Sequence, residues 1–135
     1  MRRPLCFGTL GLVALALSIP AATAPLAGAL DGKAFAATVG EAGKPSGEKD
    51  ELIFKDGKFR STACDRYGFR VAPYTTTTGP TGSTAFDATT VSPKEGKIHW
   101  QGQVRGDAVA GTYVWTKLGQ KDIHYWFKGT ARKLG

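Results

Sequence analysis

Three consecutive runs near the end of the chain constrain its fold more than any other feature. Residues 97–105, 109–117 and 123–132 each alternate apolar with polar side chains, and a short turn containing glycine separates each run from the next. These runs hold all three tryptophans of the chain, Trp100, Trp115 and Trp126. Side chains on one face of a strand recur every second residue, so the pattern predicts three antiparallel strands with two unlike faces.

Five earlier segments extend this strand pattern towards the N-terminus. They are residues 33–39, 51–55, 58–62, 71–78 and 84–90. Asp56-Gly57 predicts a two-residue hairpin turn, because both positions tolerate a positive φ. Residues 63–68 do not alternate and predict either one helical turn or a wide loop. Short strands with turn signals between them are typical of an all-β fold, here an antiparallel up-and-down meander of about eight strands that closes into a small barrel.

Glycines inside the last three strands support closure of the sheet. Gly102, Gly111 and Gly129 occupy positions where the alternation calls for a side chain. Glycine inside a strand usually marks a bulge or a sharp bend, and bends are needed to curl a sheet into a barrel. An eight-stranded barrel holds either its own side chains or one small ligand.

The first 29 residues have the pattern of a secretory signal peptide. Arg2 and Arg3 precede an apolar run over residues 10–19, Pro20 ends it, and small residues follow. The run is too short for a transmembrane helix, which needs about 20 residues. The pattern therefore predicts an exported protein, periplasmic or secreted, with no transmembrane anchor after processing.

Two cleavage sites fit the small-residue rule. Cleavage after Ala24 would leave Pro25 at the new N-terminus, where proline is a poor substrate for the peptidase. Cleavage after Ala29 avoids this difficulty and is preferred. The chain then divides into a signal peptide, residues 1–29, and a single barrel domain, residues 30–135.

Charge and cysteine content limit the partners of this domain. Loss of Arg2 and Arg3 lowers the formal net charge from +7 to +5. One interpretation of this positive charge is that it attracts an anionic surface or an anionic protein partner. The other is that it only keeps the domain soluble. Nucleic acid is not expected as a partner of an exported protein. Cys6 lies in the leader, so Cys64 is left without a partner for an intrachain disulfide.

Four phrases of the chain resemble a known group of proteins. Residues 54–59 (FKDGKF), 61–65 (STACD), 111–115 (GTYVW) and 125–130 (YWFKGT) are similar to phrases in small exported bacterial proteins of unknown function. In strand number and order the chain also resembles calycin-like barrels, the lipocalin and fatty-acid-binding group. The resemblance implies a barrel that encloses a small hydrophobic ligand. The chain lacks the Gly-x-Trp motif and the helical lid of those families, so no binding residue is carried over.

The aromatic residues of the last three strands are the candidate ligand site. Alternation places on the inner face Trp100, Tyr113, Trp115, Tyr125 and Phe127. These side chains either fill the barrel or line a pocket for a small apolar or amphiphilic ligand. The first functional hypothesis is therefore an exported, non-catalytic binding protein with its ligand inside the barrel.

A second hypothesis uses the outer face. Trp126 lies on the opposite face of its strand from Tyr125, and Lys128 shares that outer face. An outward tryptophan beside a lysine suits a partner surface. The alternative function is a protein-interaction or surface-binding module with a filled barrel.

The third hypothesis, a thiol enzyme, rests on Cys64. Asp65 and Arg66 flank it, a nearby arginine favours the thiolate, and His99 or His124 would serve as the base. Against this, a lone cysteine is more often a small buried apolar residue or a link to another chain. The chain has no catalytic motif and no His-x-His or Cys-x-x-Cys spacing, so neither an enzyme nor a metal or cofactor is expected.

Overall fold

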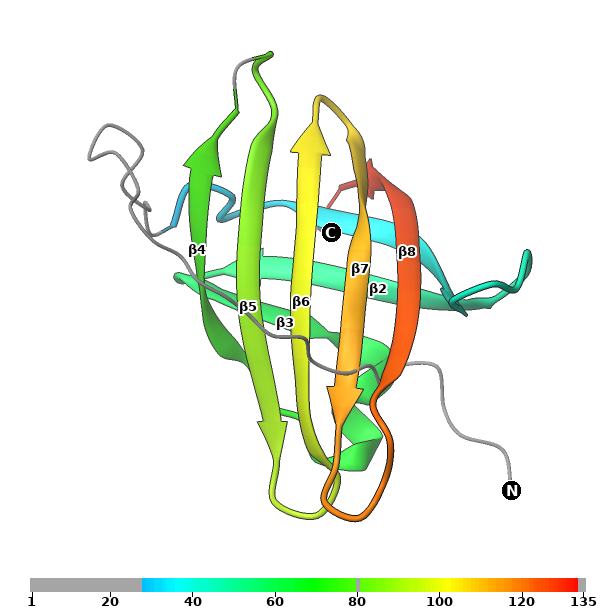
Figure 1. The fold of residues 1–135 in the computed structure, drawn as a ribbon. Coiled ribbons are helices and arrows are strands. Elements are labelled where there is room, and N and C mark those ends of the chain that lie inside the picture. The colour runs from blue at the N-terminus through cyan, green and yellow to red at the C-terminus, as the bar shows by residue number, and fades with distance from the viewer. Residues whose placement is uncertain (1–27, 80, 134–135) are drawn as a thin grey trace, which may run out of the picture.

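Strands alternate inward and outward side chains over most of the chain, and each pairs with the next. The computed structural model describes residues 28–79 and 81–133. The strands are β1 (Ala34–Glu41), β2 (Glu48–Lys55), β3 (Lys58–Ser61), β4 (Ala72–Thr78), β5 (Thr84–Ser92), β6 (Gly96–Arg105), β7 (Ala108–Thr116) and β8 (Ile123–Arg132). Since β8 also pairs with β1, the sheet closes into an up-and-down barrel (Figure 1). The predicted all-β class, meander order and closure are confirmed.

The expected leader cannot be compared with the structure. Residues 1–27, which include the cleavage site after Ala24, lie outside the described residues. The signal peptide, the cleavage site and export therefore stay predictions. Within residues 28–79 and 81–133, no helix has the length and apolar character needed to cross a membrane.

The predicted hairpin between β2 and β3 is confirmed in detail. Asp56 and Gly57 both adopt a positive φ, 54° and 76°, and Lys55 pairs directly with Lys58. Both Asp31 carboxylate oxygens accept from Gly57 N, at 2.9 and 3.0 Å. This turn geometry matches the right-handed twist of the flanking strands.

The gap between the predicted strands 33–39 and 51–55 contains more strand than expected. β1 continues to Glu41 and β2 begins at Glu48, so the loop is residues 42–47. Val39 pairs with Glu48, and Gly40 pairs with Trp126 on β8. The polar and glycine-rich composition suggested a loop, but backbone partners on both sides extend the strands.

A six-residue 3-10 helix, η2 (Thr62–Tyr67), replaces the irregular segment after β3. It ends at Gly68, whose φ of 87° is a left-handed conformation that favours glycine. Beside it the barrel wall is narrowly paired, since β3 and β4 share only two residue pairs, Lys58 with Pro73 and Phe59 with Ala72. This short seam lies next to the β2–β3 hairpin, because Lys58 is the first residue of β3.

The segment before β1 packs against an inward tyrosine. Leu30 is buried, and its N–H donates to the hydroxyl of Tyr74 at 2.8 Å. That hydroxyl in turn donates to Asp31 Oδ1 at 2.8 Å. Burial, followed by the bond to Asp31, raises the pKa of Tyr74 above its ordinary value. The tyrosine therefore stays a neutral donor that holds residues 28–33 against the barrel.

Two glycines opposite each other make room for the core. Gly102 on β6 pairs with Gly111 on β7. A Cβ on Gly102 would lie 2.7 Å from Phe127 Cζ and 2.8 Å from Phe86 Cε2. The two rings thus fill the inner space that side chains at the glycine pair would need, which gives a physical reason for interior glycine here.

Gly111→Ala should destabilise the barrel strongly. The new Cβ would stand 2.2 Å from Gln101 O and 2.5 Å from Gly102 Cα, and backbone cannot move aside cheaply. We expect a loss of about 3 kcal/mol in the free energy of unfolding, measured by urea denaturation. Gly43→Ala is the control: its φ is 88° with nothing within 4 Å, so only backbone strain of about 1 kcal/mol is expected. Equal losses in the two variants would contradict this account.

Candidate functional site

The five aromatic residues proposed as a ligand site all face the inside of the barrel. Trp100, Tyr113, Trp115, Tyr125 and Phe127 are between 0 and 3% exposed. The rings of Trp100 and Tyr113 stack at 4.1 Å between centroids, and those of Tyr113 and Tyr125 at 4.8 Å. Exposure this low leaves no water-sized space beside these side chains. The structure therefore brings the predicted residues together as one packed group.

Rings from the other half of the barrel continue this packing. Phe59 on β3 lies 4.9 Å from Trp100, and Phe54 on β2 lies 5.0 Å from Phe86 and 4.9 Å from Tyr74. Aromatic pairs at such distances contribute about 0.5–1.5 kcal/mol each beyond the burial of their surface. The ring contacts join strands from β2 to β8 across the interior.

Cys64 is buried and belongs to a small polar cluster under η2. It is 1% exposed, and its Sγ lies 3.3 Å from Ser61 Oγ. Ser61 Oγ donates to Asp50 Oδ2 at 2.5 Å. His99 and His124 are on the outer face of the sheet, where His99 Nε2 is 2.9 Å from Asp87 Oδ2. The structure thus does not bring Cys64 together with either histidine.

The two neighbours of Cys64 point away from the thiol. Asp65 forms an ion pair with Arg60, with Nη2 and Oδ2 2.5 Å apart. The hydrogen bond to Asp65 raises the pKa of Arg60. Arg66 lies over the ring of Tyr67, at 5.8 Å from the centroid. Both side chains are exposed at the surface of η2.

Asp50, which sequence reasoning missed, is the central group of this cluster. It is 8% exposed, and its Oδ1 accepts from Ala63 N at 3.0 Å and from Glu51 N at 2.6 Å. Burial raises the pKa of Asp50, while its hydrogen bonds, that from Ser61 first, oppose the rise. The carboxylate ties β2 to η2. The sequence carries no local signal for it, because Asp50 follows a run of polar residues that read as a loop.

Trp126 has the predicted outward direction but is held in place. Its Nε1 donates to Lys44 O at 2.9 Å. A Cβ on Gly40 would come within 2.5 Å of its ring, so the indole lies directly on the β1 backbone. Lys128 Nζ is 5.7 Å from the ring centroid. Trp126 thus fixes the β1–β2 loop, and part of the indole remains exposed beside Lys128.

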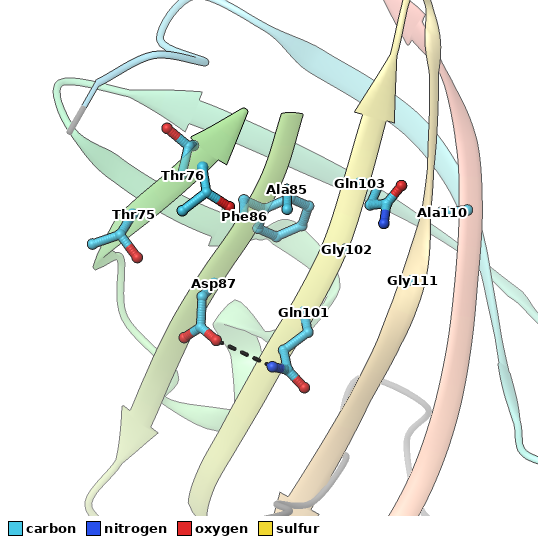
Figure 2. A pocket seen from close by; sticks show the side chains of 11 residues that line it. Thr75, Thr76, Ala85, Phe86, Asp87, Gln101, Gly102, Gln103, Ala110 and Gly111 are labelled. Atoms are coloured by element: carbon cyan, nitrogen blue, oxygen red, sulfur yellow. Dashed lines mark hydrogen bonds between the residues drawn. The ribbon is translucent and has the colours of Figure 1, made fainter. Parts of the chain in front are cut away.

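A groove of about 710 Å³ crosses the outer face of β4, β5, β6 and β7 (Figure 2). It is lined by Thr75, Thr76, Thr77, Ala85, Phe86, Asp87, Gln101, Gly102, Gln103, Ala110 and Gly111. Ala85 and Ala110 both pair with Gln103 from its two neighbouring strands. Short side chains and the backbone of the glycine pair therefore form the hollow part, and longer polar side chains stand around it.

Hydrogen bonds fix the polar wall of the groove. Gln101 Nε2 donates to Asp87 Oδ2 at 3.3 Å, as the dashed line in Figure 2 marks. The same carboxylate oxygen is held by His99 from the other side. The lining offers hydroxyls, amides and a carboxylate, and none of its eleven residues is a lysine or arginine. This set suits a neutral ligand with many hydrogen-bonding groups better than an anion.

Alternation along β5 and β6 puts Asp87, Gln101 and Gln103 on the outer face, but alternation alone does not bring them together. Their neighbourhood depends on the register between β5 and β6, which pairs Asp87 with Gln101. A register shift of one residue would turn these side chains inward. Among the described residues, no group of three or more His, Cys, Asp and Glu side chains is placed to hold a metal ion.

The thiol of Cys64 should be protected in the folded protein. Because the side chain is 1% exposed, a thiol reagent reaches it only when the structure opens. We expect Ellman's reagent to label the native protein about a thousandfold more slowly than the protein in guanidinium chloride. Complete labelling of the native protein within the mixing time would contradict this and revive the thiol-enzyme hypothesis.

Asp50→Asn should change how stability depends on pH. The folded state holds the Asp50 proton more tightly than the unfolded state does, because its pKa is raised. In the native protein this group therefore lowers stability as pH rises above the unfolded value of about 3.9 through the folded pKa. An asparagine amide keeps hydrogen bonds to the same neighbours without the charge, so Asp50→Asn should lose this component of the pH dependence.

Asp50→Ala is the matched control for this experiment. It removes the charge and the hydrogen bonds together, so we expect it to lower the free energy of unfolding by about 2–3 kcal/mol at neutral pH. The measurement is urea denaturation of all three proteins across the acid to neutral range. Parallel pH profiles for the native protein and Asp50→Asn would show that Asp50 does not titrate as described.

Comparisons with known proteins identify no relative of this chain. No protein-family model matches the chain, and no curated protein or solved structure matches it either. The structure supports the coarser part of the resemblance, an eight-stranded antiparallel up-and-down barrel. Membership of the calycin-like group stays a prediction.

Proposed function

We propose that the protein is an exported, non-catalytic binding module with a filled barrel, and that it binds a neutral glycan in the outer groove. The observation that carries this proposal is the position of the hydrogen-bonding side chains. Asp87, Gln101 and Gln103 stand around a groove of about 710 Å³ on the outer wall. The inner aromatic side chains, in contrast, pack against one another.

The chemistry of the lining supports a glycan as the ligand. A sugar hydroxyl donates one hydrogen bond and accepts others. Side-chain amides and hydroxyls can both donate to it and accept from it, and a carboxylate can accept from it. Trp126 extends the same outer face: Gln101 pairs with Thr112, and Thr112 pairs with Trp126. An indole beside polar groups provides an apolar surface with a polar edge, as suits a sugar ring.

A ligand inside the barrel, the first hypothesis from sequence, would need a different interior. Trp100 and Tyr113 are 0% exposed and stacked on each other. A bound apolar molecule would have to displace at least one of these rings. Vacating the space of a large buried aromatic side chain costs about 3–5 kcal/mol. The outer groove needs no such rearrangement, which is why the filled-barrel alternative is preferred.

The test is binding of neutral hexasaccharides to the native protein and to groove variants. Cellohexaose, chitohexaose and maltohexaose are the probes, with calorimetry and amide chemical-shift mapping as readouts. Ala110→Arg places a long side chain in the groove from an exposed position and should abolish binding. The combined change Gln101→Ala and Gln103→Ala should weaken it about 25-fold, from about 1 kcal/mol per hydrogen bond.

Thr130→Arg is the matched control for the groove variant. Thr130 is exposed on β8 and does not line the groove, so this change adds the same charge without filling the site. It should leave binding within a factor of two or so. Equal loss in Thr130→Arg and Ala110→Arg would overturn the groove as the site. Shifts of the Trp100 and Trp115 indole signals with palmitate, without any glycan response, would favour an interior ligand instead.

A further inference from the structure

Exposed large apolar side chains mark the outside of this barrel, and two of the three lie at one end. In the part of the chain that the structure describes, they are Val71, Val91 and Leu118, which are 51, 55 and 99% exposed. Val71 precedes β4, Val91 lies next to the end of β5, and Leu118 is in the β7–β8 loop. Val91 pairs with Lys97, and Lys97 pairs with Thr116 just before the β7–β8 loop, so Val91 and Leu118 lie at the same end of the barrel. Val71 lies beside the β2–β3 hairpin, where it lines a hollow with Lys55 and Lys58. In Figure 1 the end of β7 and the β7–β8 loop are at the bottom.

Leu118 is presented on a firmly held support. Lys117 Nζ and Glu95 Oε1 form an ion pair at 2.8 Å that joins the β7–β8 loop to the β5–β6 loop. Trp115 Nε1 donates to Glu95 O at 2.5 Å, and Ser92 Oγ donates to Tyr67 O at 2.8 Å. These bonds connect both loops with η2. The exposure of Leu118 is thus a property of a built surface and not of a frayed terminus.

Positive charge surrounds these apolar side chains. Exposed cationic residues at this end are Arg66, Arg70, Lys94, Lys97 and Lys121. Two of the nearby carboxylates, Asp65 and Glu95, are already paired with Arg60 and Lys117, and the third, Asp122, is exposed next to Lys121 in the chain. Val91 pairs directly with Lys97, so apolar and cationic side chains are interleaved. The end therefore carries an excess of positive charge together with exposed apolar groups.

We propose that this end of the barrel docks on an anionic lipid bilayer, with Leu118 inserted among the lipid headgroups. Interfacial binding requires apolar side chains that enter the headgroup region and cations that meet lipid phosphates. A side chain that is 99% exposed at a loop tip fits a deformable interface. A stable protein interface instead needs about 800 Å² of matched surface on each partner. The docking surface is separate from the outer groove and does not depend on the glycan proposal.

The experiment is co-sedimentation with large unilamellar vesicles of two compositions. One set contains phosphatidylcholine alone, and the other contains phosphatidylcholine with phosphatidylglycerol at a 7:3 ratio. The protein is purified from its native host, and every variant carries the same N-terminus, so any contribution of residues 1–27 cancels. We expect binding to the anionic vesicles and at least tenfold weaker binding to the neutral ones.

Variants at the docking surface separate insertion from charge attraction. Leu118→Ser should lower the partition coefficient on anionic vesicles about tenfold, through the loss of one inserted apolar side chain. The combined change Lys94→Gln and Lys121→Gln should lower it about 25-fold, at about fivefold for each lysine near an anionic surface. Lys55→Gln with Lys58→Gln removes the same charge from the β2–β3 hairpin, away from this end, and should leave most of the binding.

Three outcomes would overturn the proposal. The first is no binding to vesicles of either composition. The second is an equal loss in the hairpin control and in the Lys94 and Lys121 variant, which would indicate attraction by net charge alone. The third is unchanged binding of Leu118→Ser together with full displacement by dextran sulfate. That result would identify a general polyanion site without insertion.

Discussion

The stack of Trp100 on Tyr113 is the contact on which the rest of this structure depends. These two side chains come from adjacent strands, and their rings lie 4.1 Å apart between centroids. Both side chains are 0% exposed, so no water-sized space lies beside them inside the barrel. Both proposed sites therefore lie on the outer wall and the loops. The glycine pair of β6 and β7 serves the same packing, because its missing side chains admit the rings of Phe86 and Phe127.

The strands and their two faces were predictable because alternation is local. Ile98, Trp100 and Val104 repeat every second residue, and all are buried. The Asp56-Gly57 turn was predictable for the same reason, since its two residues select the turn type. The start of β2 was not, because Glu48 and Lys49 belong to the sheet only through their partners on β1. Such long-range pairing leaves no mark on the sequence around them.

The candidate sites were less accessible to sequence reasoning than the fold. Trp126 was correctly placed on the outer face, but its bond to Lys44 O joins β8 to the β1–β2 loop, 82 residues away in the chain. The groove depends on the cross-strand register of Asp87 and Gln101. The role of Asp50 depends on η2, which packs against β2 and donates a hydrogen bond from Ala63 N to the carboxylate. Each of these features depends on contacts between separate segments, which no single segment encodes.

The two-pair seam between β3 and β4 gives the barrel an uneven wall. Elsewhere adjacent strands share between four and nine residue pairs, so the backbone ladder is weakest at Phe59. The buried ring of Phe59 packs against Phe54, Phe86 and Trp100 beside this seam. Wall breathing should therefore begin at the seam. Because Cys64 is buried, opening of the wall, and not the thiol itself, would set how fast an oxidant in the exterior reaches the sulfur.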